Sequence, residues 1–374
     1  MTLTGHEAPA PSPPTPTHDC PDPLDPAAVR CEVDTALAAF LHEQARAAPG
    51  PELEPLLAAL RSLLHSGGKR LRTQLCLTGW HAAGGHGERD TAVRTAAALE
   101  LLQAAAVTHD DVMDASMLRR GAPAAHQALA TAYTDRGGRL GRAGIHGRSA
   151  AVLLGDLALA WSGDLLGSTP LPPGSRERVM PLVSAMHTEM VYGQYLDLLS
   201  AGTLSDDAAA ALTTARYKTA TYTVQRPLHI GAALAGAGPR LLNALSGIAL
   251  PLGEAFQLRD DLLGVFGDPA LTGKPVGDDI RHGTATVLLA LALRRASTGQ
   301  RHLLHHVVGR GSLTGHDLAR VRTILEQTGA AGQVEGMIRD RHRQALDALE
   351  RAPLPGAAVA ALRRIADTLT TRQS

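Results

Sequence analysis

Aromatic residues, cysteines and net charge are all scarce in this 374-residue chain, and each shortage excludes a class of protein. Aromatic residues make up 3% of the sequence, and no segment shows the strict alternation of apolar and polar residues that a half-buried strand requires. The three cysteines, Cys20, Cys31 and Cys76, have neither metal-ligand spacing nor a disulfide framework, which indicates a reducing cytoplasm. Because 36 Lys and Arg balance 36 Asp and Glu, we expect no nucleic-acid partner.

Long apolar runs are also missing. No run approaches the roughly 20 residues that a membrane helix needs, so we expect no membrane span. The N-terminus has no basic stretch followed by an apolar run, so we expect no signal peptide. Apolar residues nevertheless make up 44% of the chain, enough for a large core. These features predict a cytoplasmic protein.

Proline is concentrated at one end. Eight of the 23 prolines lie within the first 26 residues, among Thr, Ser and Ala. Such a stretch cannot form a core, so we predict a disordered tail over residues 1–24, which is either dispensable or a docking segment for a partner. Asp25-Pro26 is typical of a helix start, with an N-cap followed by proline at the first helical position. We therefore predict one all-helical domain over residues 25–374.

Helical periodicity dominates this domain, which predicts an all-α fold. A Gly/Arg-rich loop is expected at residues 136–147. Helices are expected over residues 29–46, 51–65, 71–83, 90–114, 124–133, 149–166, 175–200, 205–235, 239–266, 284–297, 316–327, 331–351 and 357–370.

Two aspartate-rich segments stand about 150 residues apart in this apolar chain. The first contains Asp110, Asp111 and Asp114, and the second contains Asp260 and Asp261. Asp110 and Asp114 share one face of a helix, where like charges are costly unless a cation lies between them. Carboxylate oxygens suit Mg²⁺, which prefers one or two carboxylates together with substrate phosphates. Two such faces opposite one another would clamp a magnesium–diphosphate group.

Two basic stretches, at residues 67–72 and 119–121, accompany the acidic segments. Gly67-Gly68-Lys69-Arg70-Leu71-Arg72 opens a helix, where glycines, free N–H groups and cationic side chains can receive an anion. Arg119-Arg120-Gly121 follows the first acidic segment. Taken singly, the first stretch is usually explained as a solvated basic turn, and the second is compatible with a simple ion-pair network. Together they suggest a second diphosphate site, built from cations alone, beside the metal-dependent one.

The ordered set of motifs resembles the polyprenyl synthetase family, the trans-isoprenyl diphosphate synthases. The resemblance runs from about residue 64 to residue 293. Besides the segments above it rests on Arg-Arg-Gly-x-Pro-x-x-His at 119–126, Gly-Gln-Tyr-Leu-Asp at 193–197, Lys-Thr-Ala at 218–220, Gln257 before the second acidic pair, Thr-Gly-Lys at 272–274 and Gly-Asp-Asp at 277–279.

The resemblance implies a single helical bundle around a deep central cavity, the class I isoprenoid synthase fold, and a homodimer. It implies an Mg²⁺-dependent prenyltransferase that condenses isopentenyl diphosphate with an allylic diphosphate. It assigns metal binding to Asp110, Asp111, Asp114, Asp260 and Asp261. The allylic diphosphate would contact Arg119, Lys218 and Lys274; isopentenyl diphosphate would contact Lys69, Arg72, Gln103 and Arg120; and Thr219, Gln257, Gln194 and Asp197 would line the reacting region.

Two positions depart from the family pattern. Gly264 stands at the fifth position of the second motif, where many members have aspartate, and Asp268 farther on is a candidate to compensate. Thr284 replaces a lysine that would help to close the site over the allylic diphosphate. We expect metal binding to survive the change at Gly264, because the first aspartate of the motif does most of the coordination. Thr284 is expected to weaken closure or affinity without abolishing activity, since Lys218, Lys274 and Arg119 remain.

Product length is expected to depend on the helix before Asp110. In the family, bulky aromatic residues four or five positions upstream stop growth early, whereas this chain has Ala106 and Ala105 there, with Leu102 as a lower floor. This pattern favours geranylgeranyl diphosphate, although the alanines are also compatible with simple tight packing.

Three other functions fit parts of the pattern. A class I terpene cyclase also uses DDxxD, but it needs no isopentenyl site and has an Asn/Ser/Glu second motif that is missing here. A non-catalytic or partner-dependent subunit of a heteromeric synthase would usually lose the first aspartate cluster, which this chain keeps. A helical scaffold without a ligand leaves both acidic clusters unexplained.

Overall fold

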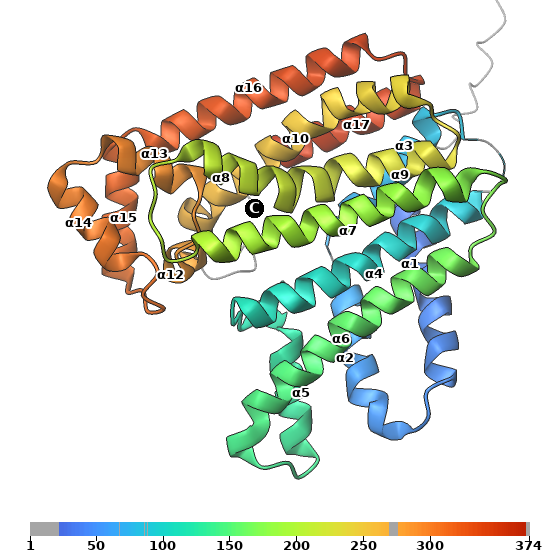
Figure 1. Ribbon diagram of the computed structural model, residues 1–374, viewed down its shortest axis with the longest axis horizontal. Helices are drawn as coiled ribbons and strands as arrows, with labels where there is room; N and C mark the ends of the chain where they lie inside the picture. Colours follow the sequence, from blue (N-terminus) through green and yellow to red (C-terminus); the bar gives the residue numbers. More distant parts are fainter. Residues whose placement is uncertain (1–21, 67, 86, 88, 269–275, 372–374) are drawn as a thin grey trace, which may run out of the picture.

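The computed structural model describes residues 22–66, 68–85, 87, 89–268 and 276–371, and their architecture is helical (Figure 1). The predicted all-α fold is confirmed. The first half of the chain forms α1 (Pro26–Arg46), η1 (Pro51–Leu53), α2 (Glu54–His65), α3 (Leu71–Ala82), α4 (Arg89–Met113), β1 (Leu118–Arg119), β2 (Ala122–Pro123), α5 (Ala125–Asp135) and α6 (Leu140–Ser168). The second half forms α7 (Ser175–Ser200), α8 (Ala208–Ala215), η2 (Arg216–Gln225), α9 (Arg226–Leu234), α10 (Pro239–Phe266), α12 (Asp278–His282), α13 (Val287–Arg295), α14 (Thr298–Val307), α15 (Gly315–Gln327), α16 (Ala330–Arg351) and α17 (Gly356–Thr370).

Most helices lie close to where periodicity predicts them, and the start of α1 follows its predicted cap. The side chain of Asp25 accepts a hydrogen bond of 2.8 Å from the backbone N–H of Ala28, with Pro26 at the first helical position. The predicted loop at 136–147 is wrong for most of its length, because α6 already begins at Leu140. Of the predicted tail over residues 1–24, residues 1–21 lie outside the described residues, whereas Leu24 is 4% exposed and belongs to a cluster of buried apolar side chains.

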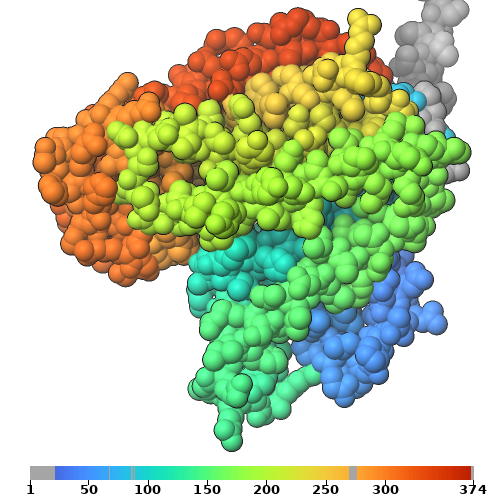
Figure 2. All heavy atoms as spheres, viewed as in Figure 1, coloured from blue at the N-terminus to red at the C-terminus, as the bar shows by residue number. Residues whose placement is uncertain are grey.

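Three clusters of buried apolar side chains hold the bundle together. One cluster joins α1, α2, α4, α6 and α7, the second joins α10 to α12 through α16, and the third joins α3, α9, α10, α16 and α17. Figure 1 shows α4, α7 and α10 running across the middle of the molecule, and Figure 2 shows α14 and α15 (orange) forming one end of it. The aspartate-bearing ends of α4 and α10 therefore both lie toward the α12 to α15 end.

Among the described residues, two helices are long and apolar enough to cross a membrane, whereas the sequence was expected to contain no such segment. They are α6 and α10, and in each the most apolar 18-residue window is 44% buried inside the protein. Both contribute buried residues to the clusters just described, α6 to the first and α10 to the second and third. Core helices of this kind satisfy the same criteria, so the finding is weak support for a membrane span.

The segment η2 interrupts one long helical path with π-helical hydrogen bonding between α8 and α9. It carries Lys218 and Thr219, and its neighbours along the sequence, Ala215 and Arg226, have ordinary α-helical φ and ψ values. Widened turns of this kind are frequent at functional sites. Here η2 places Lys218 between α4 and α7.

Candidate active site

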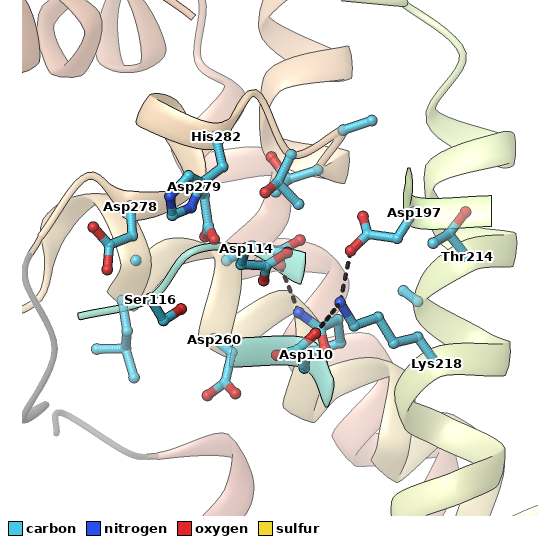
Figure 3. Close-up of a pocket in the computed structure, with 18 of the residues that line it drawn as sticks. Asp110, Asp114, Ser116, Asp197, Thr214, Lys218, Asp260, Asp278, Asp279 and His282 are labelled. Carbon is cyan, nitrogen blue, oxygen red and sulfur yellow. Dashed lines mark hydrogen bonds and ion pairs between the residues drawn. The ribbon is translucent and has the colours of Figure 1, made fainter. Parts of the chain in front are cut away.

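A pocket of about 320 Å³ opens where the ends of α4, α7, η2, α10 and α12 meet. Its walls carry the first acidic segment on one side and the second on the other (Figure 3). Among its lining residues are Asp110, Asp114, Arg119, Asp197, Lys218, Gln257, Asp260, Asp261, Gly264, Asp278, Asp279, His282 and Thr284. The structure thus brings together two aspartate motifs that lie far apart in the sequence.

The first acidic wall uses two of its three predicted aspartates. Asp110 and Asp114 lie one helical turn apart at the end of α4 and line the pocket. Asp111 is 1% exposed and does not line the pocket; its carboxylate accepts hydrogen bonds of 3.0 and 3.2 Å from Nε of Arg119. In this arrangement Asp111 orients Arg119 toward the pocket, and its assignment as a metal ligand stays a prediction.

Lys218 supplies the positive charge that the first wall lacks. Its Nζ donates to Oδ2 of Asp197 at 2.6 Å and to Oδ1 of Asp110 at 3.3 Å (Figure 3). Although burial alone would lower the pKa of Lys218, Asp110 and Asp197 raise it, so the ammonium group stays charged. Burial, and then the charge of Asp110, raise the pKa of Asp114 to about 7. The pocket therefore holds more carboxylate than its own cations neutralise.

The second acidic wall is ordered by a chain of side-chain hydrogen bonds. Oγ1 of Thr219 donates to Oε1 of Gln257 at 2.5 Å, and Nε2 of Gln257 donates to Oδ1 of Asp261 at 2.8 Å. Burial raises the pKa of Asp261 well above its usual range, and the neighbouring charges of Asp279 and Asp260 add to this. Gln257 lines the pocket, whereas Thr219 is 8% exposed and lies behind it.

The residues around the pocket fit a divalent cation that is shared with a substrate. Within the described ranges, no three His, Cys, Asp or Glu side chains lie close enough to hold an ion by themselves. Mg²⁺ is usually bound through one or two carboxylates together with waters and substrate phosphate oxygens, not by a complete protein cage. Oxygen donors on two facing walls, with Lys218 and Arg119 beside them, match that requirement.

A second group of cations lies apart from the carboxylate walls. The guanidinium of Arg120 lies directly beside Gly68, whose φ of 123° is a backbone conformation that favours glycine. Burial lowers the pKa of Arg120; Glu100 opposes the effect, and Arg119, Arg70 and Arg72 add to it. Cations gathered in this way favour binding of an anion, as the sequence predicted for Lys69, Arg72 and Arg120.

Gln103 joins this basic group through a residue that the sequence did not single out. The hydroxyl of Tyr222 donates to Oε1 of Gln103 at 3.0 Å, and the guanidinium of Arg72 lies 4.5 Å from the centre of the Tyr222 ring. Arg72 also donates to Oγ1 of Thr223 at 2.6 Å. Tyr222 and Thr223 follow Lys218-Thr219 along η2. In the sequence, the one sign that Tyr222 belongs to the site is that an aromatic residue stands just past the Lys-Thr-Ala motif.

Arg70 supports the same group from behind. Its backbone has a left-handed φ of 46°, which an arginine adopts only where the surroundings enforce it. Its buried guanidinium donates to Glu100 at 2.8 Å and to Asp34 at 2.6 Å. The ion pairs join α1 and α4 to the start of α3 and so fix Lys69 and Arg72 on either side of Arg70.

Three other predicted positions are placed less directly. Nε2 of Gln194 is buried and makes no hydrogen bond within the described part of the chain, and Gln194 does not line the pocket, so its role in the reacting region stays a prediction. Lys274 lies outside the described residues. Leu102 and Ala105 are 2% and 3% exposed, and neither they nor the half-buried Ala106 line the pocket described above. The positions predicted to set chain length thus lie in the packed part of α4, on the turns before Asp110, and that role stays a prediction.

An all-helical bundle with two facing aspartate walls beside a separate basic cluster is the architecture of the isoprenyl diphosphate synthases. Comparison with known proteins agrees: the polyprenyl synthetase family model matches residues 54–326. The chain belongs to the polyprenyl synthetase family and is a prenyltransferase, a trans-polyprenyl diphosphate synthase.

Relatives with different products are similar to this chain. A geranylfarnesyl diphosphate synthase of Aeropyrum pernix is 32% identical over 80% of this chain and 88% of its own length. A geranylgeranyl diphosphate synthase of Mycobacterium tuberculosis is 29% identical over 86% of this chain and 91% of its own. A crystal structure of a geranylgeranyl pyrophosphate synthase from Corynebacterium glutamicum, complexed with isoprenyl diphosphate and magnesium, has 38% identity and a TM-score of 0.89, covering 93% of this chain and 99% of its own.

Proposed function

We propose that this synthase is Mg²⁺-dependent and joins isopentenyl diphosphate head to tail (1'-4) to an allylic diphosphate, giving geranylgeranyl diphosphate. The observation that carries the proposal is the pairing of a carboxylate-walled pocket with a separate cluster of cations. Such a pair suits two diphosphate esters held side by side, one with metal and one without. A terpene cyclase would have no use for the second site.

The chemistry follows from the distribution of charge. The bond between C1 of the allylic substrate and its diphosphate oxygen breaks, and Lys218 and Arg119 stabilise the leaving diphosphate. Lys69, Arg72 and Arg120 hold isopentenyl diphosphate so that C4 of its double bond forms the new bond to C1. A proton then leaves C2 of the isopentenyl unit for the departing diphosphate. Bound magnesium, held by Asp110, Asp114 and Asp260, would supply further positive charge against the leaving group.

The direct test is product analysis. Purified protein is incubated with labelled isopentenyl diphosphate and dimethylallyl, geranyl or farnesyl diphosphate, with Mg²⁺ or with EDTA, and the products are dephosphorylated and identified. We expect geranylgeraniol with Mg²⁺ and no incorporation with EDTA. If folded protein incorporates nothing from any primer, the chain acts as a partner-dependent subunit, and the proposal is wrong.

Product length should respond to the predicted chain-length positions on α4. Ala105→Phe adds a ring on the α4 turn before Asp110 and is expected to shorten the product toward farnesyl diphosphate. Leu102→Ala removes bulk one turn lower and is expected to lengthen it. Opposite shifts in the two variants distinguish a floor from a general disturbance, and an unchanged distribution in both contradicts the floor.

A homodimer is proposed as the assembled form. Large apolar side chains are exposed along α6 and α7, among them Leu140 (82%), Leu153 (63%), Tyr195 (61%) and Leu199 (61%). Exposed apolar area of this kind marks an interaction surface. Sedimentation of the wild type and of Leu153→Glu tests the assignment; a wild-type monomer would contradict it. The cytoplasmic location remains a prediction.

A further inference from the structure

One buried carboxylate lies outside the pocket and has no part in the chemistry described so far. Glu254 lies on α10, is 2% exposed and does not line the pocket. Its Oε1 accepts hydrogen bonds from Nε of Arg216 at 2.8 Å and from Nη2 of the same residue at 2.5 Å. Its Oε2 accepts from Nε of Arg341 at 2.6 Å. Burial of a carboxylate is costly, and these two cations offset the cost.

The two arginines lie on different elements. Arg341 belongs to α16, whereas Arg216 is the first residue of η2 and precedes Lys218 by two positions. The pair between Glu254 and Arg216 therefore ties the start of the π-helical segment to α10. Because the backbone is continuous, an anchor at this point restricts where Lys218 can lie.

The helix α10 holds the same part of η2 at two further points. A Cβ built on Gly253 would lie 2.5 Å from Cα of Ala220, so the two backbones approach very closely. Oγ1 of Thr219 donates at 2.5 Å to Gln257, which lies about one turn after Glu254 on α10. Together with the ion pair, these contacts fix the first half of η2 against α10.

The other end of η2 has a separate anchor. Arg226 directly follows η2, and its Nε donates to Oε2 of Glu189 on α7 at 2.8 Å. The residues of η2 that contact the basic cluster, Tyr222 and Thr223, stand near this end. Each half of η2 thus has its own ion pair, and each half contacts a different one of the two groups of site residues.

We propose that Arg216 and Glu254 are positioning residues that act through Lys218. Their ion pair sets the start of η2 and so holds the ammonium group of Lys218 between the carboxylates of Asp110 and Asp197. Neither Arg216 nor Glu254 lines the pocket, so neither is placed to touch a substrate. The inference rests on the proposed function, because it takes Lys218 to contact the allylic diphosphate.

The two arginines on Glu254 provide a matched comparison. Arg216→Gln and Arg341→Gln each remove one cation from the same carboxylate, but only the first releases η2. Arg216→Lys keeps the charge and serves as the conservative rescue. The side chain of Arg216 is 50% exposed, so we expect its variants to fold, and thermal melting checks this.

A second comparison asks whether Arg216 acts through Lys218. Arg216→Gln is combined with Lys218→Ala, because a residue that only positions Lys218 has nothing left to position when that side chain is gone. Calorimetry measures the binding of geranyl diphosphate with Mg²⁺, and of isopentenyl diphosphate, separately for the wild type and each variant. These measurements do not depend on turnover.

We expect Arg216→Gln to weaken the binding of geranyl diphosphate by about tenfold, Arg216→Lys to recover most of the loss, and both to bind isopentenyl diphosphate within about twofold of the wild type. Arg341→Gln should lower the melting temperature at least as much, because Arg341 is the less exposed partner at 26%, and should leave both affinities within about twofold. With Lys218→Ala already present, Arg216→Gln should change the binding of geranyl diphosphate by less than about twofold.

Three results would overturn the inference: Arg216→Gln binds geranyl diphosphate like the wild type, Arg341→Gln weakens this binding equally, or the effect of Arg216→Gln persists in full without Lys218. A different result overturns the proposed role of Lys218, and the inference with it. In that case the wild type binds no geranyl diphosphate with Mg²⁺, or Lys218→Ala binds it as tightly as the wild type does.

Discussion

Gly193→Ala is the substitution for which the structure gives the sharpest expectation. Gly193 lies on α7, directly against η2, and a Cβ there would stand 2.6 Å from Cα of Lys218 and closer still to its backbone nitrogen. The neighbouring atoms are backbone, so they cannot rotate out of the way. Lys218 must move for the variant to fold, and its contacts with Asp110 and Asp197 must move with it.

The cost can be estimated by comparing two glycines inside helices. Ala replaces Gly in a helix interior with a gain of about 1 kcal/mol when nothing obstructs it. Gly163 on α6 has open space around its Cβ position, so Gly163→Ala should show that gain. At Gly193 the overlap should cost about 1–3 kcal/mol, as overpacking usually does, and should outweigh the gain.

Chemical denaturation of both variants at one protein concentration measures this difference. We expect Gly193→Ala to unfold at lower denaturant than the wild type and Gly163→Ala at higher. Calorimetry should show weaker binding of an allylic diphosphate to Gly193→Ala, with isopentenyl diphosphate binding unchanged. If the two variants are equally stable and bind alike, the close approach of α7 to η2 is refuted.

Two further predictions concern the first acidic wall. Because the pKa of Asp114 is raised from 3.8 to about 7, its ionised form destabilises the metal-free fold, and the penalty grows as pH rises from about 4 to about 7 and is constant above that. Asp114→Asn should therefore melt at higher temperature than the wild type at pH 8 in EDTA, with the difference vanishing near pH 4; a less stable variant at pH 8 would contradict this. Asp111→Asn removes the buried partner of Arg119 and should lower the free energy of unfolding by about 3 kcal/mol or somewhat less, because Arg119 retains 15% exposure. Asp110 is more exposed, so Asp110→Asn should lower the free energy of unfolding far less than Asp111→Asn does, but it should weaken Mg²⁺ binding more. The reverse ranking of the two variants would exclude these separate roles of Asp110 and Asp111.

The sequence was sufficient for the helical fold, because helical periodicity is a local signal. Helical spacing also places Asp110 and Asp114 on one face, whereas the position of the second aspartate pair opposite them was implied by the resemblance to the family. The same spacing did not show that Asp111 would turn to Arg119, since that depends on where the β1–β2 turn folds back. The approach of the Asp279 carboxylate to Gly264 leaves no local signal either, because it arises from the packing of α12 on α10.

The main errors in the predicted fold concern short or glycine-rich helices. The helix α12 has five residues between two glycines with left-handed φ, too short for a periodic pattern. Glycines at the start of α6 suggested a loop, but Gly147 is needed there because its Cβ position would meet the carbonyl oxygen of His126 on α5. For α14 a signal existed: Ser297 and Gln300 form a capping box, whose sequence pattern predicts a helix start.

The central claim is that two diphosphates bind side by side, one against carboxylates and metal and the other against cations alone. The most direct test is to measure KM for each substrate separately in the wild type, Lys69→Ala and Lys218→Ala. Lys69→Ala should raise the KM for isopentenyl diphosphate by about ten- to hundredfold and leave that for the allylic diphosphate nearly unchanged, and Lys218→Ala should do the reverse. If either variant raises both KM values together, the two sites are not separate and the account is wrong.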